Sequence, residues 1–322
     1  MSDISRVIYY PTLACNCRCK HCGEEQRLYE PECDCELIEQ RLVESRYFEN
    51  MILSITGGEP FLKKGFPDML ARVNTGGGYR CFTDVTTNGI CTEQIGSFCE
   101  QTLEAGGQPE RLFFAVSIDG LPEVHNRIRR NPIAFEKAIE TVKLLKRKGI
   151  PLQINTVIQQ ENYDSLDKFA AYITEICGET RIAWIPEISQ LAGKSGFSYN
   201  EEQRKGVLRR IEAQGDLIGR AYLERYGDIR LRDCHAGQKT FVIAPSGKVY
   251  ACATGFSYKG LKNRERFYIG DLKEQTLDEI YEICQDEDAP FRKTVRACTG
   301  CWGTCEVGHE LNFWGRKIED FM

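Results

Sequence analysis

The sequence has no surplus of positive charge and no long apolar run. Its 322 residues include 42 Lys and Arg against 47 Asp and Glu, which gives a net charge of -5, so composition gives no support for binding to nucleic-acid phosphates. No stretch approaches the roughly 18 apolar residues of a transmembrane helix, and the amino terminus lacks the basic and apolar segments of a secretory signal. We therefore expect a cytoplasmic protein that binds neither membranes nor nucleic acids.

Cysteine, in contrast, is abundant, with 16 residues in the chain. In a reducing compartment, dense cysteine indicates metal ligation or catalysis rather than disulfides. The hydrophobic content of 42% supplies enough core for one large domain and a small one. An iron-sulfur or zinc site is therefore the first hypothesis.

Apolar, β-rich segments alternate with helical patterns about every 30 residues. The segments are 7–13, 51–56, 81–87, 111–118, 152–158 and 181–185. The clearest helical pattern covers 132–148 and ends before Gly149. Repeated βα units predict a parallel sheet, and six of them predict a partial (β/α)6 barrel of the TIM type, with the active face on the loops after the strands.

The carboxyl-terminal part has a different pattern. A charged helical stretch covers 200–226, and apolar segments at 241–244 and 249–252 flank the turn Pro245-Ser246-Gly247, which predicts a β-hairpin. The rest is loop-rich and dense in cysteine, which is typical of a small domain held by a metal. We expect a core domain at 1–226 and a metal-binding domain at 227–322.

A cysteine motif follows the first predicted strand. Cys15, Cys19 and Cys22 have the spacing Cys-x3-Cys-x2-Cys if Cys17 is passed over. Three thiolates in one loop would leave one iron of a four-iron cubane open to a ligand that is not protein, which favours catalysis over electron carriage. Zinc and chance clustering remain alternatives, because soft thiolates suit either metal.

A second motif, Thr56-Gly57-Gly58-Glu59-Pro60, follows the second predicted strand. With both motifs in this order, the sequence resembles the radical SAM superfamily over about residues 7 to 190. The resemblance implies a [4Fe-4S] cluster on Cys15, Cys19 and Cys22. It also implies that S-adenosylmethionine (SAM) chelates the open iron and that Gly57 to Pro60 supports its amino group. One electron would then cleave SAM to a 5'-deoxyadenosyl radical that abstracts hydrogen from a substrate.

Five further positions match the family's pattern. The resemblance places His21 beside the adenine and Asn88, at the exit of the third strand, in a supporting position. It implies that Ser117, Asp119 and Arg129 contact the ribose and the SAM carboxylate. An Asp-Gly pair at a strand end is also ordinary turn chemistry, so this last assignment has an alternative.

The carboxyl-terminal cysteines resemble the SPASM and Twitch extensions of radical SAM enzymes. These extensions bind auxiliary iron-sulfur clusters after a hairpin with a Gly-x4-Cys motif, here Gly247 to Cys252. One auxiliary [4Fe-4S] cluster is expected, because no cysteine follows Cys305. The favoured ligands are Cys234, Cys252, Cys298 and Cys301, with Cys305 and then His309 as substitutes. A structural zinc remains the alternative.

The auxiliary domain implies a ribosomally made peptide or a protein side chain as substrate. The rival substrate is a small metabolite, such as an aminoglycoside-type sugar, and a third reading is a non-catalytic electron carrier, which would not need Gly57 to Pro60. An electron donor such as flavodoxin or ferredoxin is expected. Because the chain starts six residues before its first strand, we expect a peptide substrate to bind through the barrel mouth and the carboxyl-terminal domain or to be delivered by a separate leader-binding partner. Cys33 and Cys35 are either hydrogen-donating thiols or plain loop residues, and no catalytic residue is identified.

Overall fold

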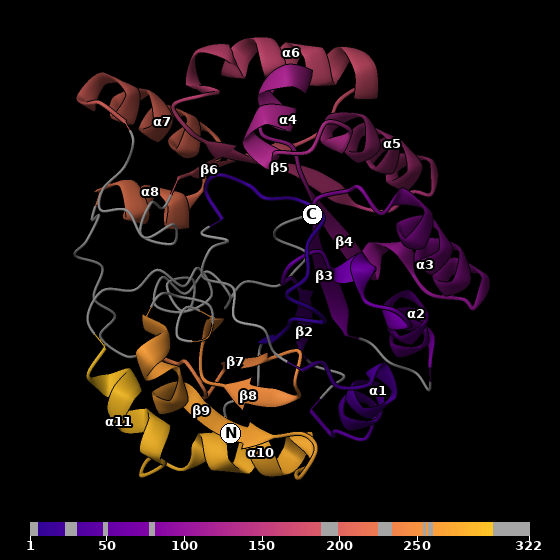
Figure 1. Ribbon diagram of the computed structural model, residues 1–322, viewed down its shortest axis with the longest axis vertical. Coiled ribbons are helices and arrows are strands. Elements are labelled where there is room, and N and C mark those ends of the chain that lie inside the picture. Colours follow the sequence, from indigo (N-terminus) through magenta and orange to yellow (C-terminus); the bar gives the residue numbers. More distant parts are fainter. Residues whose placement is uncertain are drawn as a thin grey trace.

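The computed structural model describes residues 6–22, 31–47, 51–76, 81–187, 199–224, 234–253, 256 and 260–298. Within these residues, nine strands form one sheet in the order β6-β5-β4-β3-β2-β1-β7-β8-β9. The first six strands are parallel and confirm the six predicted strands and the partial (β/α)6 barrel (Figure 1). They are β1 (Arg6–Tyr9), β2 (Ile52–Ile55), β3 (Phe82–Thr87), β4 (Leu112–Ser117), β5 (Leu152–Ile158) and β6 (Ile182–Pro186).

Helices connect the strands and cover the outer face of the sheet (Figure 1). The predicted helix at 132–148 is α5, Ala134–Arg147. The others in the barrel region are α1 (Cys35–Val43), α2 (Phe66–Thr75), α3 (Thr92–Glu104), α4 (Pro122–Arg129), α6 (Leu166–Cys177), α7 (Glu201–Ala213) and α8 (Leu217–Glu224). Short 3-10 helices are η3 (Pro60–Leu62), η4 (Pro109–Arg111) and η5 (Tyr163–Ser165). Among the described residues, no helix combines the length and the apolar character needed to cross a bilayer.

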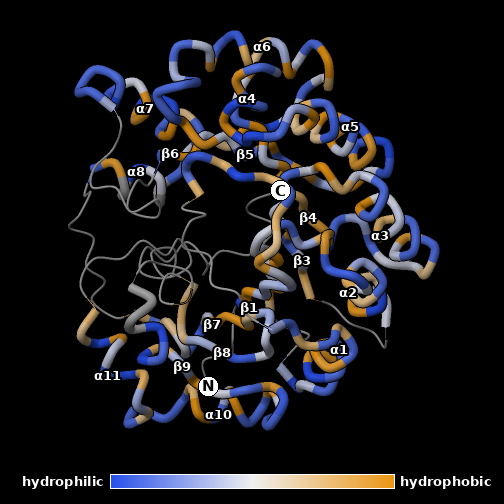
Figure 2. Tube along the Cα trace, viewed as in Figure 1, coloured by the Kyte–Doolittle hydropathy of each residue, from blue (hydrophilic) through white to orange (hydrophobic). Residues whose placement is uncertain are grey.

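The main apolar core lies between the sheet and these helices. Side chains alternate between the two faces of a strand, so every second residue points into this core. Val7, Tyr9, Leu53, Ile55 and Phe114 all do so and are almost completely buried. Figure 2 shows hydrophobic residues along the strands, while the helices alternate between hydrophobic and hydrophilic residues. Burial of this apolar face holds the barrel layers together.

The inner face of the sheet is more polar. Arg6 Nη1 and Ser54 Oγ both donate to Asp84 Oδ2, each at 2.8 Å, across three adjacent strands. Nearer the carboxyl ends of the strands, Ser117 and Asn155 are register partners and therefore share this face. The inside of the partial barrel therefore presents hydrogen-bonding groups toward the active end.

The carboxyl-terminal part extends the same sheet. The predicted hairpin is confirmed as β7 (Thr240–Ile243) and β8 (Lys248–Tyr250), and β9 (Tyr268–Asp271) pairs with β8. Strand β7 runs parallel to β1, so the sheet continues beyond residue 227, and residues 225–233 lie outside the described ranges. Among the described residues, this part also contains the helices η6 (Gly260–Phe267), α10 (Leu277–Gln285) and α11 (Pro290–Arg296).

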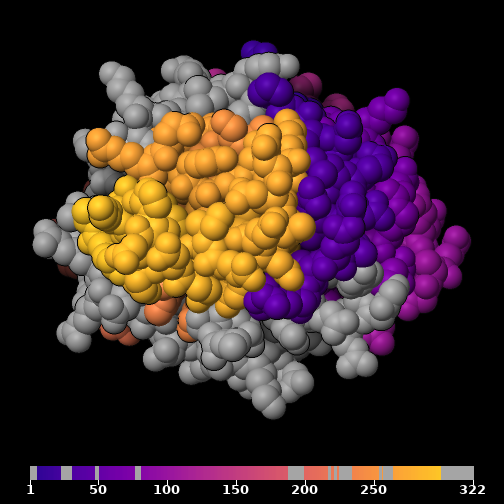
Figure 3. Space-filling view, turned by 90° about the horizontal axis from the view of Figure 1, so that it is seen from below, coloured from indigo at the N-terminus to yellow at the C-terminus, as the bar shows by residue number. Residues whose placement is uncertain are grey.

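Side-chain contacts also join the two parts. Ser45, just after α1, donates to Asp278 Oδ1 at 2.7 Å, and the ring centroids of Tyr47 and Tyr281 are 4.1 Å apart. In Figure 3 the atoms of the carboxyl-terminal region lie directly against those of the amino-terminal region. The auxiliary region is therefore anchored on β1 and α1.

The first strand is shorter than predicted. The apolar pattern predicts a strand to Leu13, but β1 ends at Tyr9. Pro11 has no N–H to donate to a ladder, and beyond it the carbonyls of Thr12 and Ala14 accept hydrogen bonds from the segment that follows β2. The apolar residues after Tyr9 therefore form the approach to the cysteine motif.

Candidate active site

The two predicted motifs fit together backbone against backbone. Gly58 N donates to Thr12 O at 2.9 Å, and Glu59 N donates to Ala14 O at 2.7 Å. A Cβ at Gly58 would lie 1.9 Å from Ala14 O, and Gly57 has a φ of 133°, in the region that favours glycine. Two glycines at the end of β2 therefore let the chain approach closely and fix the start of the cysteine loop.

We expect Gly58→Ala to lower both the stability and the bound iron. The added methyl group must displace the backbone at Ala14, next to Cys15, and such overpacking costs about 1–3 kcal/mol. Urea unfolding and iron analysis after anaerobic reconstitution would measure the two effects. Gly96→Ala is the matched control, because its methyl group would meet only the end of the Leu144 side chain, at 3.3 Å. Equal iron content in both variants would contradict this role of Gly58.

Glu59 joins the exits of β2 and β3. Its side chain is fully buried, Thr87 Oγ1 donates to Oε1 at 2.7 Å, and Asn88 N donates to Oε2 at 2.8 Å. The Asn88 side chain in turn donates to Asn16 Oδ1 at 2.6 Å and contacts Cys15 Sγ at 3.8 Å. Burial raises the pKa of Glu59 to about 7. The Glu59 side chain is thus linked through Asn88 to the first motif cysteine.

The raised pKa of Glu59 predicts a pH-dependent stability. Its pKa is about 7 in the folded protein against an ordinary value of 4.5, so the folded state holds a proton that the unfolded chain releases in this window. The free energy of unfolding should therefore fall by about 3 kcal/mol as pH rises from about 4.5 to 7. Urea unfolding across this range would measure it. Glu59→Gln, which can accept from Asn88 and donate to Thr87, should remove this part of the slope, and an unchanged slope would contradict the assignment.

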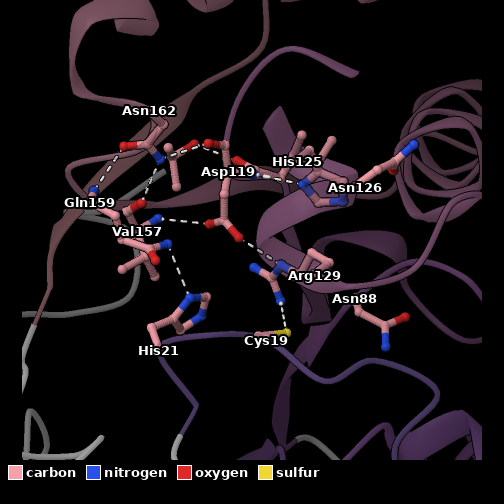
Figure 4. Close-up of polar contacts among 12 residues, drawn as sticks. Cys19, His21, Asn88, Asp119, His125, Asn126, Arg129, Val157, Gln159 and Asn162 are labelled. Carbon is pink, nitrogen blue, oxygen red and sulfur yellow. Dashed lines mark hydrogen bonds and ion pairs between the residues drawn. The ribbon is translucent and has the colours of Figure 1, made fainter. Parts of the chain in front are cut away.

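Asp119 and Arg129 form a buried ion pair behind the cysteine loop (Figure 4). Asp119 Oδ2 accepts from Arg129 Nε at 2.6 Å, and Oδ1 accepts from Val157 N at 3.0 Å. Burial alone would raise the pKa of Asp119, but the Arg129 guanidinium holds it below its usual value. Arg129 Nη1 lies 3.6 Å from Cys19 Sγ. The pair therefore places a fixed positive charge against a motif thiol.

The loop after β5 adds two residues that the sequence analysis does not identify. Gln159 Nε2 lies 3.1 Å from His21 Nδ1, and Asn162 Oδ1 accepts from Gln159 N at 2.8 Å. Asn162 Nδ2 donates to Asp119 O at 2.6 Å, so the contacts continue to the ion pair (Figure 4). Burial lowers the pKa of His21 to about 4, which keeps its imidazole neutral. The position of Gln159 and Asn162 directly after a strand of the predicted barrel is the one sequence signal for these two residues.

His125 supports this network from α4. Its Nδ1 accepts from Asp119 N at 2.9 Å, and its ring packs edge-on against Phe135. Burial lowers the pKa of His125 to about 3, so the ring is a neutral structural group. Ser117, the remaining predicted position, is buried at the end of β4 on the inner face.

The donor set of the cysteine loop fits iron-sulfur binding. Cys19 is buried beside Arg129, and hydrogen bonding from Cys17 and the Arg129 charge lower the pKa of Cys19 to about 7, which favours the thiolate that iron requires. Hydrogen bonds to Cys15 and Cys19 raise the pKa of Cys17, in keeping with a thiol that is passed over. Cys22 is exposed. In the described ranges no three His, Cys, Asp or Glu side chains converge on one point, so the fit rests on the chemistry of the thiols.

Only part of the predicted auxiliary site lies within the described residues. Cys234 and Cys252 are half-buried, and Cys298 is exposed. Cys301, Cys305 and His309 lie outside the described ranges. Cys33 and Cys35 are buried at the start of α1, where Cys33 N donates to Pro245 O at 2.8 Å, under the β7–β8 turn. The auxiliary ligand set therefore stays a prediction.

Comparisons with known proteins match both regions. Residues 9–173 match the radical SAM superfamily, and residues 234–302 match the SPASM iron-sulfur cluster-binding domain. The second range includes Cys234, Cys252, Cys298 and Cys301 and ends before Cys305.

Three similar proteins illustrate the range of relatives. The AdoMet-dependent heme synthase of Oleidesulfovibrio alaskensis is 32% identical over 159 residues, which are 48% of this chain and only 39% of that protein. The PqqA peptide cyclase of Granulibacter bethesdensis is 24% identical over 78% of this chain and 68% of its own length. The crystal structure of Streptococcus suis SuiB bound to precursor peptide SuiA has a TM-score of 0.66 and 15% identity, over 92% of this chain and 68% of that one.

The family match covers half of the chain, and the structural likeness supports the same barrel. Membership implies a SAM-binding [4Fe-4S] cluster in the barrel and iron-sulfur binding in the SPASM region. The chain belongs to the radical SAM superfamily and carries a SPASM iron-sulfur cluster-binding domain after its partial barrel.

Proposed function

We propose that this protein is a radical SAM enzyme that modifies a ribosomally made peptide. The observation that carries the catalytic part is the cysteine loop itself, which rests on Gly57 to Glu59 and is contacted at Cys19 by the Arg129 guanidinium. The peptide part is supported by a curated relative, a peptide cyclase, that matches 78% of this chain. We place the core domain at 1–226 and the auxiliary domain at 227–322.

Cys15, Cys19 and Cys22 would hold the catalytic cluster. When bound, this cluster and SAM supply a carbon-centred radical that removes a hydrogen atom from the substrate. Arg129 stabilises the Cys19 thiolate and offers a positive charge to the SAM carboxylate, and Gly57 to Pro60 would support the SAM amino group. The chain would thus provide a charged contact for the SAM carboxylate and a polar contact for the SAM amino group.

The buried network suggests how the other predicted residues share the work. Both carboxylate oxygens of Asp119 already accept hydrogen bonds, from Arg129 and Val157, so we assign Asp119 to the positioning of Arg129 rather than to the ribose. Ser117, on the polar inner face, is then the better candidate for a ribose hydroxyl. Neutral His21, held by Gln159, would lie beside the adenine. Asn88 orients the loop at Cys15.

The auxiliary cluster is proposed to lie on Cys234, Cys252, Cys298 and Cys301, with Cys305 as the substitute. Cys234 precedes β7 and Cys252 follows β8, in the part of the sheet that continues from β1 and the catalytic loop. An extended peptide bound at the barrel mouth would make main-chain hydrogen bonds and become ordered on binding, which costs about 2–5 kcal/mol. We therefore expect modest affinity, or delivery by a separate leader-binding protein.

The test compares peptide and metabolite substrates directly. Anaerobically reconstituted protein would be incubated with SAM, a reductant and each short peptide encoded beside its gene, and 5'-deoxyadenosine and peptide mass would be measured. A peptide substrate should increase 5'-deoxyadenosine, change in mass and transfer deuterium from one labelled residue. Conversion of a free sugar or amino acid, with every encoded peptide inert, would instead favour a dehydrogenase acting on a small metabolite.

A further inference from the structure

A strip of positive charge borders the cysteine loop. Segments 14–22 and 126–135 contain five Lys and Arg residues and no Asp or Glu, although the whole chain has a net charge of -5. Four of the five cationic side chains are exposed: Arg18, Lys20, Arg127 and Arg130. The local charge therefore has the opposite sign to that of the whole chain, and we call these four residues the basic strip.

The two segments of the strip lie side by side. Arg18 N donates to Arg129 O and Lys20 N donates to Ile128 O, each at 3.1 Å, and Asn131 Nδ2 donates to Asn16 O at 2.9 Å. These contacts hold the end of α4 along the outside of the cysteine loop. The fifth cation, Arg129, is buried between them and reaches Cys19 Sγ at 3.6 Å. Arg18 and Lys20 thus flank Cys19 in the sequence, and Arg127 and Arg130 lie in the segment whose Arg129 contacts Cys19.

An ordinary explanation covers only part of the strip. Cations in the last turn of a helix offset its dipole, which accounts for Arg127 and Arg129 on α4. It also extends to Arg130, the C-cap residue of α4 with a φ of 52°, but not to Arg18 and Lys20, which lie on the other segment. Among the described residues, Glu161 pairs with Lys20 at 2.9 Å and also interacts with the charge of Arg127, so it offsets part of the positive charge.

An apolar side chain adjoins the charges. Ile133, which directly precedes α5, is 46% exposed. In the described ranges, Leu62 is the one other large hydrophobic side chain that is similarly exposed. One exposed apolar side chain is ordinary on a protein surface, whereas an excess of charge of one sign favours an oppositely charged partner. Charge complementarity speeds the encounter of such partners more than it tightens their complex.

We propose that the basic strip, with Ile133, is the docking surface for a small acidic electron-carrier protein of the flavodoxin type. This inference rests on the proposed function, which requires one electron at the cluster on Cys15, Cys19 and Cys22. The flavin hydroquinone of the carrier loses one electron and becomes a semiquinone, and the oxidised cluster gains that electron. Docking here brings the carrier next to Cys19 and leaves the inner face of the barrel to the substrate.

The experiment reverses charge on the strip but outside the cysteine loop. Arg127→Glu/Arg130→Glu would be compared with Lys205→Glu/Arg209→Glu, an equal change of charge at two exposed residues of α7, which packs on β6 and α8. Affinity for flavodoxin hydroquinone and the rate at which it reduces the cluster would be measured anaerobically at two salt concentrations. We expect about tenfold weaker binding for the strip variant, less than twofold for the control, and a smaller salt dependence for the strip variant.

A charge-neutralising variant and a measurement with dithionite complete the test. Arg127→Gln/Arg130→Asn removes charge without reversing it, and Asn tolerates the left-handed φ at position 130, so this variant should show an intermediate loss. SAM cleavage driven by dithionite should be unchanged in all variants, because dithionite needs no docking. Wild-type affinity for flavodoxin in both strip variants would overturn the proposal. So would weaker binding of a precursor peptide with unchanged flavodoxin binding, which would assign the strip to the substrate. Failure of the wild type to cleave SAM with dithionite would contradict the proposed function and leave the binding measurement intact.

Discussion

Replacement of Cys15, Cys19 and Cys22 by alanine is expected to abolish SAM cleavage and to remove about half of the iron, since two cubanes would hold about eight irons in all. We propose these three thiols as the donors of the family's catalytic cluster, and the pKa of about 7 for Cys19 favours the thiolate that this role requires. Iron analysis and 5'-deoxyadenosine formation with dithionite as reductant would measure both effects. Zinc should be minor in the reconstituted wild type.

Cys17→Ala is the matched control within the same loop. Hydrogen bonds of the Cys17 thiol raise its pKa, so we expect this thiol to stay protonated in the wild type. The Cys17→Ala variant should therefore keep most of the iron. Retained 5'-deoxyadenosine formation in the triple variant would refute the catalytic assignment. An equal loss of iron in Cys17→Ala would show that the ligands are misassigned.

Arg129→Met should produce the largest loss of stability among the single substitutions considered. The substitution leaves the Asp119 carboxylate, which is fully buried, without its cation, and breaking a buried pair in this way costs about 3–5 kcal/mol. It also removes the charge beside Cys19, so the affinity of the loop for iron should fall. Urea unfolding and iron analysis of anaerobically reconstituted protein would measure the two effects separately.

Arg210→Met gives the matched control on a surface pair. Arg210 Nη2 lies 2.6 Å from Asp167 Oδ1, as close as the buried pair, but the Asp167 side chain is 85% exposed. Exposed pairs contribute about 0–1 kcal/mol, so the control should change stability little. The double variant Asp119→Asn/Arg129→Met should recover part of the loss, because no buried charge remains. Similar losses for Arg129→Met and Arg210→Met would show that Asp119 is not held as a buried anion.

The sequence by itself determined the fold class and the two motifs. The period of about 30 residues between apolar segments predicted six parallel strands, because each strand and its covering helix bury an apolar face that the local pattern records. The spacing of Cys15, Cys19 and Cys22 and the position of Gly57 to Pro60 after the second strand identified the family, because both signals lie within short stretches of chain. The hairpin around Pro245 to Gly247 was also predictable, since its turn residues are local.

The tertiary structure alone decided how these parts meet. That β7 pairs with β1 and extends the barrel sheet depends on partners more than 200 residues apart, for which no local pattern exists. The end of β1 at Tyr9 depends on hydrogen bonds that Gly58 and Glu59 donate to Thr12 and Ala14. Asp119, predicted with Ser117 and Arg129 to contact the ribose and the SAM carboxylate, accepts hydrogen bonds from Arg129 and Val157, and Gln159 joins the site through a loop with no recognisable motif. Pairing and burial arise from contacts between distant segments, so they follow from the folded arrangement and not from the order of residues.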